Sequence, residues 1–242
     1  MMERYVVRKI PRYDEKLCNE FARLGCATVY EAQGQTGLLN DSLKPIQQDA
    51  SVCGPAVTVT CHAGDNLMVH AAVECCQPGD ILVVTTEGES NKHGMIGELL
   101  VKSLMKRGVK ALIMDAGVRD TMQLRELGFP VWTTSIVCTG TTKNKAGWVN
   151  APAVCAGVLV EPGDLIVADD DGVVVVKRED IPQALEKSLA REKKEQETTR
   201  KIEEGRLGID FYGFREVLAK LGVRYYDTLE QAAESARSKR DT

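Results

Sequence analysis

The chain has 242 residues, of which 43% are hydrophobic and 27% are charged, as in ordinary soluble globular proteins. Its formal net charge of -4 argues against a nucleic-acid partner, because such proteins usually carry an excess of basic residues. It has no run of about 18 apolar residues that could span a membrane, and its first residues lack an apolar signal core. We therefore expect a cytoplasmic protein with no nucleic-acid and no membrane partner.

The chain contains eight cysteines, which raises the question of a zinc site or disulfides. No C-x-x-C pair occurs among them, so the common spacing of a zinc cage is missing. Several cysteines stand in apolar segments, and we expect them to be reduced, buried thiols.

The first predicted element is a helix over residues 14–33. Asp14 is placed to cap it, and Leu17, Phe21 and Leu24 follow helical spacing. Gly25 should interrupt the helix, and residues 27–33 then form a short second segment.

The middle of the chain alternates strands and helices. The apolar runs and glycines predict strands at 81–86, 109–114 and 129–134, separated by helices at 96–106 and 121–127. This order implies parallel strands, and ligands of such sheets bind beyond the carboxyl ends of the strands. The loops at 87–98 and 115–120 both leave carboxyl ends, so we expect them to border one cleft.

Further strands are predicted at 157–160, 165–168 and 172–177. Asp169-Asp170-Asp171-Gly172 joins the last two and could indicate a cation site, although Asp-Gly is typical of a hairpin turn. A long charged helix should follow over 181–206, either as a solvated helix or in contact with another subunit. We therefore divide the chain into an α/β core, 1–180, and a C-terminal helical extension, 181–242, expected to contact a neighbouring subunit.

The segment Gly97-Glu98-Leu99-Leu100 stands at the start of the helix predicted at 96–106. The amides of a first helical turn have no partner within the helix, and such a site favours a carboxylate or phosphate. The segment is either an ordinary helix start or a binding site for a substrate carboxylate.

The second segment is Asp115-Ala116-Gly117-Val118-Arg119-Asp120. We expect Gly117 to form a tight turn that exposes the side chains after it. Arg119 could hold a carboxylate or enolate oxygen, and Asp120 is an oxygen ligand suited to Mg²⁺, although the pair could also be a loop salt bridge. Glu98 and Asp120 on one rim would repel each other without a cation or a shared proton. A metal ion with a general base is therefore a coherent hypothesis.

Short motifs elsewhere accompany these two segments. They are Gly54-Pro55-Ala56-Val57-Thr58-Val59, Gly64-Asp65-Asn66 and Pro78-Gly79-Asp80. Over residues 15–227 the chain resembles the class II pyruvate aldolases that act on 4-hydroxy-4-methyl-2-oxoglutarate and 4-carboxy-4-hydroxy-2-oxoadipate. The signature of that family is an acidic residue, twenty intervening residues and then Arg-Asp, which Glu98 and Arg119-Asp120 match.

The resemblance implies a β/β/α swivelling-domain-like core of the α/β class, a homotrimer or homohexamer, and Mg²⁺ or Mn²⁺ as cofactor. Asp120 would bind the metal, and Arg119 would bind the pyruvyl part of a small 2-oxo acid substrate. The amides from Gly97 to Leu100, including those of Glu98 and Leu99, would hold the substrate carboxylate.

Two glutamates complete the site that the resemblance implies. Glu98 would position or deprotonate a water molecule at the metal. Glu195 from the C-terminal helix of a neighbouring subunit is expected near the metal, with Glu192 as the alternative.

The implied reaction is retro-aldol cleavage to pyruvate plus oxaloacetate or a second pyruvate, in the catabolism of aromatic compounds such as protocatechuate. Oxaloacetate decarboxylation is expected as a side activity, because it passes through the same enolate. The segment Tyr30-Glu31-Ala32-Gln33-Gly34 looks more like the branch that acts on the carboxylated substrate. Two alternatives remain: a non-catalytic regulator of ribonuclease E activity, and a lyase or decarboxylase for another 2-oxo acid.

Overall fold

The computed structural model describes residues 3–88 and 92–238. Its contacts divide the chain into two compact units, Met1–Glu192 and Lys193–Thr242. The boundary expected from the sequence, 180/181, precedes the long helix α5 (Ile181–Glu203), whereas the division by contacts lies within it.

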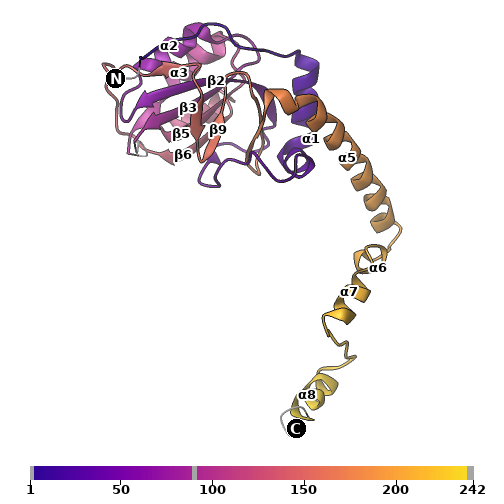
Figure 1. Ribbon diagram of the computed structural model, residues 1–242. Helices are drawn as coiled ribbons and strands as arrows, with labels where there is room; N and C mark the ends of the chain where they lie inside the picture. The colour runs from indigo at the N-terminus through magenta and orange to yellow at the C-terminus, as the bar shows by residue number, and fades with distance from the viewer. Residues whose placement is uncertain (1–2, 89–91, 239–242) are drawn as a thin grey trace. The chain divides into compact units, whose positions relative to one another are not determined.

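The first unit is built on a nine-stranded sheet with the order β1-β6-β5-β3-β2-β10-β11, in which β4 pairs with β5 and β7 with β2 (Figure 1). Strands β3, β5 and β6 are parallel, as predicted, β2 pairs in parallel with β3, and β10 and β11 continue the sheet in antiparallel fashion. A separate hairpin is formed by β8 and β9. The strands are β1 (Lys44–Pro45), β2 (Val52–His62), β3 (Ile81–Glu87), β4 (Gly94–Ile96), β5 (Ala111–Val118), β6 (Val131–Ile136), β7 (Trp148–Val149), β8 (Ala153–Cys155), β9 (Val158–Val160), β10 (Leu165–Ala168) and β11 (Val173–Val176).

The helices predicted at 14–33, 96–106, 121–127 and 181–206 are present as α1, α3, α4 and α5. The helices are α1 (Glu15–Ala32), α2 (Leu67–Cys75), α3 (Glu98–Lys106), α4 (Thr121–Glu126), α5 (Ile181–Glu203), α6 (Gly208–Phe211), α7 (Phe214–Lys220) and α8 (Leu229–Ser238). None of the helices in the described residues is long and apolar enough to cross a membrane.

Helix α1 begins and bends where the sequence predicts. The Asp14 side chain accepts a hydrogen bond of 2.7 Å from the Leu17 amide, which satisfies a free donor of the first turn. Gly25 has φ 77° and ψ 164°, a conformation that breaks the helix and that glycine adopts without strain.

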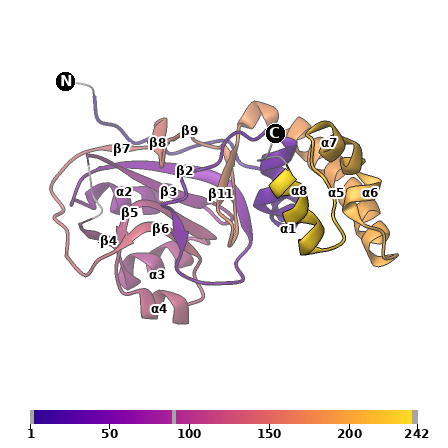
Figure 2. The ribbon, with the colours of Figure 1, turned by 90° about the horizontal axis from the view of Figure 1, so that it is seen from below.

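Alternate side chains of the central strands enter two different cores. On β3, Leu82 and Val84 pack with α2, α3 and α4, whereas Ile81 and Val83 pack with the β8–β9 hairpin and with β10 and β11. Figure 2 shows α3 and α4 on one side of the sheet and the hairpin on the other. A third core joins α1 and the start of α5 to β10 and β11. The expected α/β fold with a helical C-terminal region is therefore confirmed.

The three consecutive aspartates form the turn between β10 and β11, and the carboxylates of Asp169 and Asp170 accept backbone hydrogen bonds. Asp169 Oδ2 accepts from the Cys26 amide at 2.7 Å, and Asp170 Oδ2 accepts from the Asp49 amide at 2.8 Å. The carbonyl of Asp169 accepts from the indole Nε1 of the buried Trp132 at 2.8 Å. Of the two interpretations left open by the sequence, the hairpin turn is the one found.

Candidate active site

The start of α3 and the end of β5 lie side by side. Strand β4, which leads into α3, pairs in parallel with β5, with Gly94 opposite Gly117 and Ile96 opposite Val118. The ladder continues one residue further, because the Arg119 amide donates to the Ile96 carbonyl at 2.9 Å. The predicted proximity of these two segments is thus confirmed, although β4 itself falls in what the sequence suggested was a loop.

Asp120 caps α3 from outside the helix. The N-cap position of α3 is Gly97, which has no side chain to accept a hydrogen bond. Asp120 Oδ2 takes this role and accepts from the Glu98 amide at 3.0 Å. The Asp120 backbone is left-handed, with φ 57° and ψ 35°, a conformation that aspartate tolerates better than most residues. This backbone turn directs the carboxylate back toward α3.

Gly97 leaves room for this arrangement. A Cβ atom at position 97 would lie 2.3 Å from Asp120 Oδ2 and 3.0 Å from Arg119 Cγ. In the structure, the group that approaches closely is the Asp120 carboxylate.

Arg119 and Asp120 form a loose, accessible pair. Arg119 Nε lies 3.8 Å from Asp120 Oδ2, and the two side chains are 44% and 41% exposed. An exposed pair of this kind contributes little to stability. Both charged groups are therefore open to a ligand.

Glu98 meets Asp120 through its backbone amide, while its carboxylate lies 2.5 Å from Lys102 Nζ, one helical turn later. The side chain of Leu99 is 80% exposed and that of Leu100 is buried. The amides of Leu99 and Leu100 belong to the first turn, so they have no acceptor within the helix. They are the groups of this segment best placed to bind a carboxylate.

The structure corrects the interpretation of the segment before Arg119. Strand β5 runs to Val118, so Asp115 lies within the strand, and its Oδ2 accepts from the Ala156 amide at 2.6 Å. Gly117 does not form a tight turn. A Cβ there would lie 2.5 Å from the His93 carbonyl oxygen and 2.8 Å from Ser135 Oγ, so the glycine allows β4 to pack closely against β5.

Asp65, for which the residue pattern suggested no role, organises the loop that precedes α2. Its buried carboxylate accepts from the Thr142 hydroxyl at 2.7 Å and from the amides of Asn144 at 2.7 Å and Leu67 at 3.0 Å. Burial raises the pKa of Asp65, but these hydrogen bonds outweigh burial, so the pKa lies below its ordinary value. The signal available in the sequence was the Gly64-Asp65-Asn66 motif.

This loop meets the candidate site at His93. A Cβ on Gly64 would lie 3.0 Å from the His93 ring, and the carbonyl of Thr139 accepts from the Gly94 amide at 2.8 Å. His93 Nδ1 is buried and has no hydrogen-bond partner among the described residues. The His93 ring is therefore packed against the loop at Gly64.

The donor set at Asp120 fits a weakly coordinated Mg²⁺ or Mn²⁺. In the described parts of the chain, no three His, Cys, Asp or Glu side chains gather as a metal cage. Mg²⁺ is commonly held by one or two carboxylates and keeps several waters. Asp120 Oδ2 is occupied by the Glu98 amide, while Oδ1 accepts no hydrogen bond from residues 3–88 or 92–238, so one oxygen remains available for a cation.

The two glutamates of the C-terminal region lie in different units. Glu192, in the first unit, accepts hydrogen bonds from Arg23 on both carboxylate oxygens, which lowers its pKa. Glu195 belongs to the second unit, where its carbonyl accepts from the Thr199 hydroxyl at 2.9 Å. The role of Glu195 in a neighbouring subunit stays a prediction.

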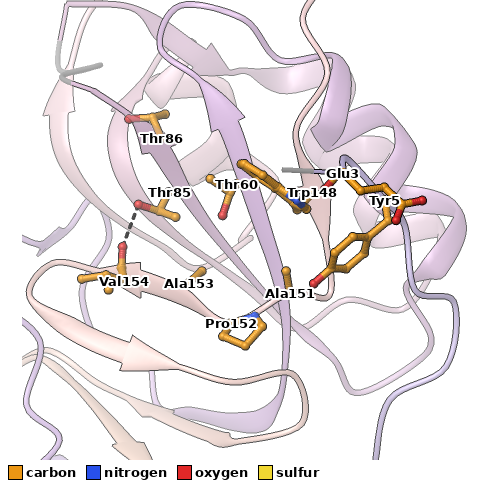
Figure 3. Close-up of a pocket in the computed structure, with 10 residues that line it drawn as sticks. All are labelled: Glu3, Tyr5, Thr60, Thr85, Thr86, Trp148, Ala151, Pro152, Ala153 and Val154. Carbon is orange, nitrogen blue, oxygen red and sulfur yellow. Dashed lines mark hydrogen bonds between the residues drawn. The ribbon is translucent and has the colours of Figure 1, made fainter. Parts of the chain in front are cut away.

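A cavity of 560 Å³ lies at the carboxyl ends of β2 and β3. Figure 3 shows Thr60 and Thr85 from these strands, with Tyr5 and Trp148 from other segments and Val154 on the β8–β9 hairpin. Thr85 donates to the Val154 carbonyl at 2.9 Å. Neither Arg119 nor Asp120 lines this cavity, so its size alone does not make it the reactive site.

Comparisons with known proteins identify relatives of this chain. A protein of Halalkalibacterium halodurans with the provisional name 4-hydroxy-4-methyl-2-oxoglutarate aldolase is 30% identical over 174 residues, which are 72% of this chain and 82% of that protein. A Burkholderia multivorans protein with the same provisional name is 33% identical over 144 residues, 60% of this chain and 87% of that one.

The fold is also that of a solved structure, the crystal structure of Streptomyces coelicolor RraAS2, described as an unusual member of the RNase ES inhibitor RraA protein family. It has a TM-score of 0.69 and 28% identity, over 79% of this chain and 99% of that chain. The model of the RraA-like family, described as Aldolase/RraA, matches residues 25–175. This chain therefore belongs to the RraA-like family.

Proposed function

We propose that this protein is a metal-dependent aldolase that cleaves 4-carboxy-4-hydroxy-2-oxoadipate, 4-hydroxy-4-methyl-2-oxoglutarate, or both. The products are pyruvate and either oxaloacetate or a second pyruvate, and oxaloacetate decarboxylation is a side activity. The observation that carries this proposal is the contact of Asp120 with the first amide of α3, with the accessible guanidinium of Arg119 beside it. The provisional names of the relatives support the same reaction class.

Each group has a role that its surroundings support. The free amides of Leu99 and Leu100 bind the carboxylate of the 2-oxo acid, since the first turn of a helix favours an anion. Arg119 binds the pyruvyl part and stabilises the negative charge that develops on its oxygen when the C3–C4 bond breaks. Glu98, which is exposed enough to leave Lys102, accepts the proton of the C4 hydroxyl through a water molecule.

Asp120 would hold a divalent cation through Oδ1. A bound Mg²⁺ or Mn²⁺ supplies a Lewis acid that polarises the 2-oxo group. While Oδ2 remains fixed by the Glu98 amide, the carboxylate cannot rotate freely, so α3 and Asp120 keep a constant relative position.

The family resemblance extends the proposal to the assembly. We propose a homotrimer or homohexamer in which Glu195 of a neighbouring subunit approaches the metal. The substitution Glu195→Gln should then lower the pyruvate release rate, whereas Glu197→Gln, on the same helix, should leave it unchanged.

The test of the function is pyruvate release from each substrate, followed with lactate dehydrogenase, with Mg²⁺ or Mn²⁺ and with excess chelator. Activity should disappear with the chelator and return with the metal. Asp120→Asn should lower activity about 10²–10³-fold and raise the metal concentration needed for half-maximal rate. The matched control is Asp41→Asn, a change at an exposed loop position.

Activity that survives complete chelation would contradict the metal role. An Asp120→Asn variant with normal metal dependence would contradict the assignment of Asp120.

The second candidate is a non-catalytic regulator of ribonuclease E, which the similarity to Streptomyces coelicolor RraAS2 favours. This candidate predicts no pyruvate release from any 2-oxo acid with either metal, together with slower RNA cleavage by ribonuclease E when the protein is added. Release of pyruvate from a different 2-oxo acid alone would instead favour a lyase or decarboxylase of other specificity.

A further inference from the structure

Helix α1 and strand β2 bring two cysteines together, far from the candidate active site in sequence. Cys18 on α1 and Cys53 on β2 belong to the same buried core between α1, β10 and β11. The two thiols are close enough that each acts on the pKa of the other. Neither forms a disulfide in this structure. Two neighbouring thiols can form a disulfide where their Cα atoms lie within about 7 Å of each other.

Cys18 also faces a cavity. It is only 3% exposed, but it lines a cavity of 210 Å³ together with Tyr13, Glu15, Lys110 and Arg12. A water molecule occupies about 30 Å³, so a molecule as small as hydrogen peroxide fits easily. The cavity thus gives a small oxidant access to the sulfur of Cys18.

The charges around this cavity favour a thiolate at Cys18. Arg12 is paired with the buried Asp80 at 2.8 Å, and the positive charge of Lys110 acts on the sulfur. The hydrogen bond with Cys53 and the charge of Lys110 lower the pKa of Cys18, against burial and the carboxylates of Asp14 and Glu15.

The pKa values of three other buried thiols are shifted in the opposite direction, upward. The pKa of Cys53 is raised by the hydrogen bond with Cys18 and by burial. Burial raises the pKa of Cys61 to about 12, and it raises that of Cys26 further. Of the two thiols, Cys18 lines the cavity and Cys53 does not. Since the thiolate is the reactive form of cysteine, Cys18 is placed as the attacking thiol and Cys53 as the partner that reacts second.

We propose that Cys18 and Cys53 form a peroxide-sensitive thiol pair that closes to a disulfide between α1 and β2. In the first step the Cys18 thiolate attacks one oxygen of hydrogen peroxide. The O–O bond breaks, the departing hydroxide takes up a proton as water, and Cys18 becomes a sulfenic acid.

In the second step the sulfur of Cys53 attacks the sulfur of Cys18. The S–O bond breaks, and the departing hydroxide leaves as water with the proton of the Cys53 thiol. Two thiols and one peroxide thus give one disulfide and two waters. Two electrons pass from the thiols to the peroxide.

The experiment uses the full-length, reduced protein and hydrogen peroxide near stoichiometric amounts. Samples are quenched, unfolded, labelled with maleimide and analysed by peptide mass spectrometry. We expect a crosslinked peptide pair containing Cys18 and Cys53, and loss of the Cys18 thiol at least about tenfold faster than that of Cys26 or Cys61. All samples carry the substitution Cys138→Ser, because Cys138 is exposed and its thiol would otherwise react with the peroxide independently.

Two variants separate the steps. Cys53→Ser should leave Cys18 as a sulfenic acid that dimedone traps, and Cys18→Ser should leave Cys53 reduced. Cys26→Ser, a buried cysteine on the same helix, should form the crosslink as the parent protein does. Circular dichroism shows whether each variant is folded. If a variant does not fold, the crosslink in the parent protein still tests the proposal.

The proposal is overturned if Cys18 reacts no faster than Cys26. It is also overturned if Cys18 is oxidised to a sulfinic acid in the parent protein with no crosslink to Cys53.

Discussion

The substitution Gly97→Ala tests whether the contact between Asp120 and α3 governs activity. The new methyl group would lie 2.3 Å from Asp120 Oδ2 and 3.1 Å from Arg119 Nε. A normal contact of about 3.4 Å requires the carboxylate to move by roughly 1 Å, because carbon atoms do not approach other heavy atoms more closely without strain. That movement lengthens the hydrogen bond from the Glu98 amide, now 3.0 Å, until it is lost.

Two effects follow from this displacement. Loss of the cap should destabilise the protein by about 1 kcal/mol. A misplacement of about 1 Å in a group that positions the substrate costs about 10²-fold in rate. We therefore expect kcat/KM for pyruvate release to fall about 100-fold, with a modest drop in the urea midpoint.

The control for this variant is Gly208→Ala on α6, where the added Cβ would meet the rings of Tyr212 and Phe211 at ordinary distances of 3.6 Å and 3.8 Å. This control should behave as the parent protein in both assays. A Gly97→Ala enzyme within twofold of the parent, with an unchanged metal requirement, would show that the close packing at Gly97 is irrelevant to catalysis.

Three further changes are expected to have measurable effects. Arg119→Ala should lower kcat/KM about 10²–10³-fold, measured by steady-state kinetics, while leaving the urea midpoint nearly unchanged because the side chain is exposed. Asp65→Asn should make the melting temperature fall less steeply with decreasing pH at acidic pH. The pKa of Asp65 is lower in the folded than in the unfolded protein, so the stabilisation by its carboxylate is present above the unfolded pKa of 3.8 and is lost as the pH falls through the folded pKa. Melting temperatures measured from pH 6 down to about pH 2 test this. A variant whose melting temperature falls as steeply with pH as that of the parent protein would refute it. Asp14→Ala should cost about 1 kcal/mol in urea unfolding through loss of the α1 cap, and a loss below about 0.3 kcal/mol would mean that the cap contributes little.

The fold was largely predictable because local signals and hydrophobic periodicity agree along most of the core. The glycine at 25 and the cap at Asp14 mark the course of α1, and apolar runs after Pro-Gly-Asp turns mark β3 and β10. Strand β4 was missed because three residues carry no periodicity, and its pairing with β5 depends on a long-range contact.

The candidate site was predictable in its location but not in its detail. The spacing of Glu98 and Asp120 indicates one rim, since parallel strands end at the same edge of the sheet. Which atom of Glu98 meets Asp120 depends on the left-handed backbone of Asp120 and on the empty volume at Gly97, and neither is visible in a residue pattern. The position of Asp115 within β5 depends likewise on how far the ladder extends.

The aspartate turn between β10 and β11 also limits how this chain can be rearranged. Surface hairpin tips are usually favoured places for grafted segments and for new chain ends. Here the carboxylate of Asp169 holds the bend of α1 at Cys26, and its carbonyl anchors the indole of Trp132. A circular permutant opened at this tip would therefore loosen two distant parts of the molecule at once. An engineer seeking an insertion point should avoid it despite its place on the surface.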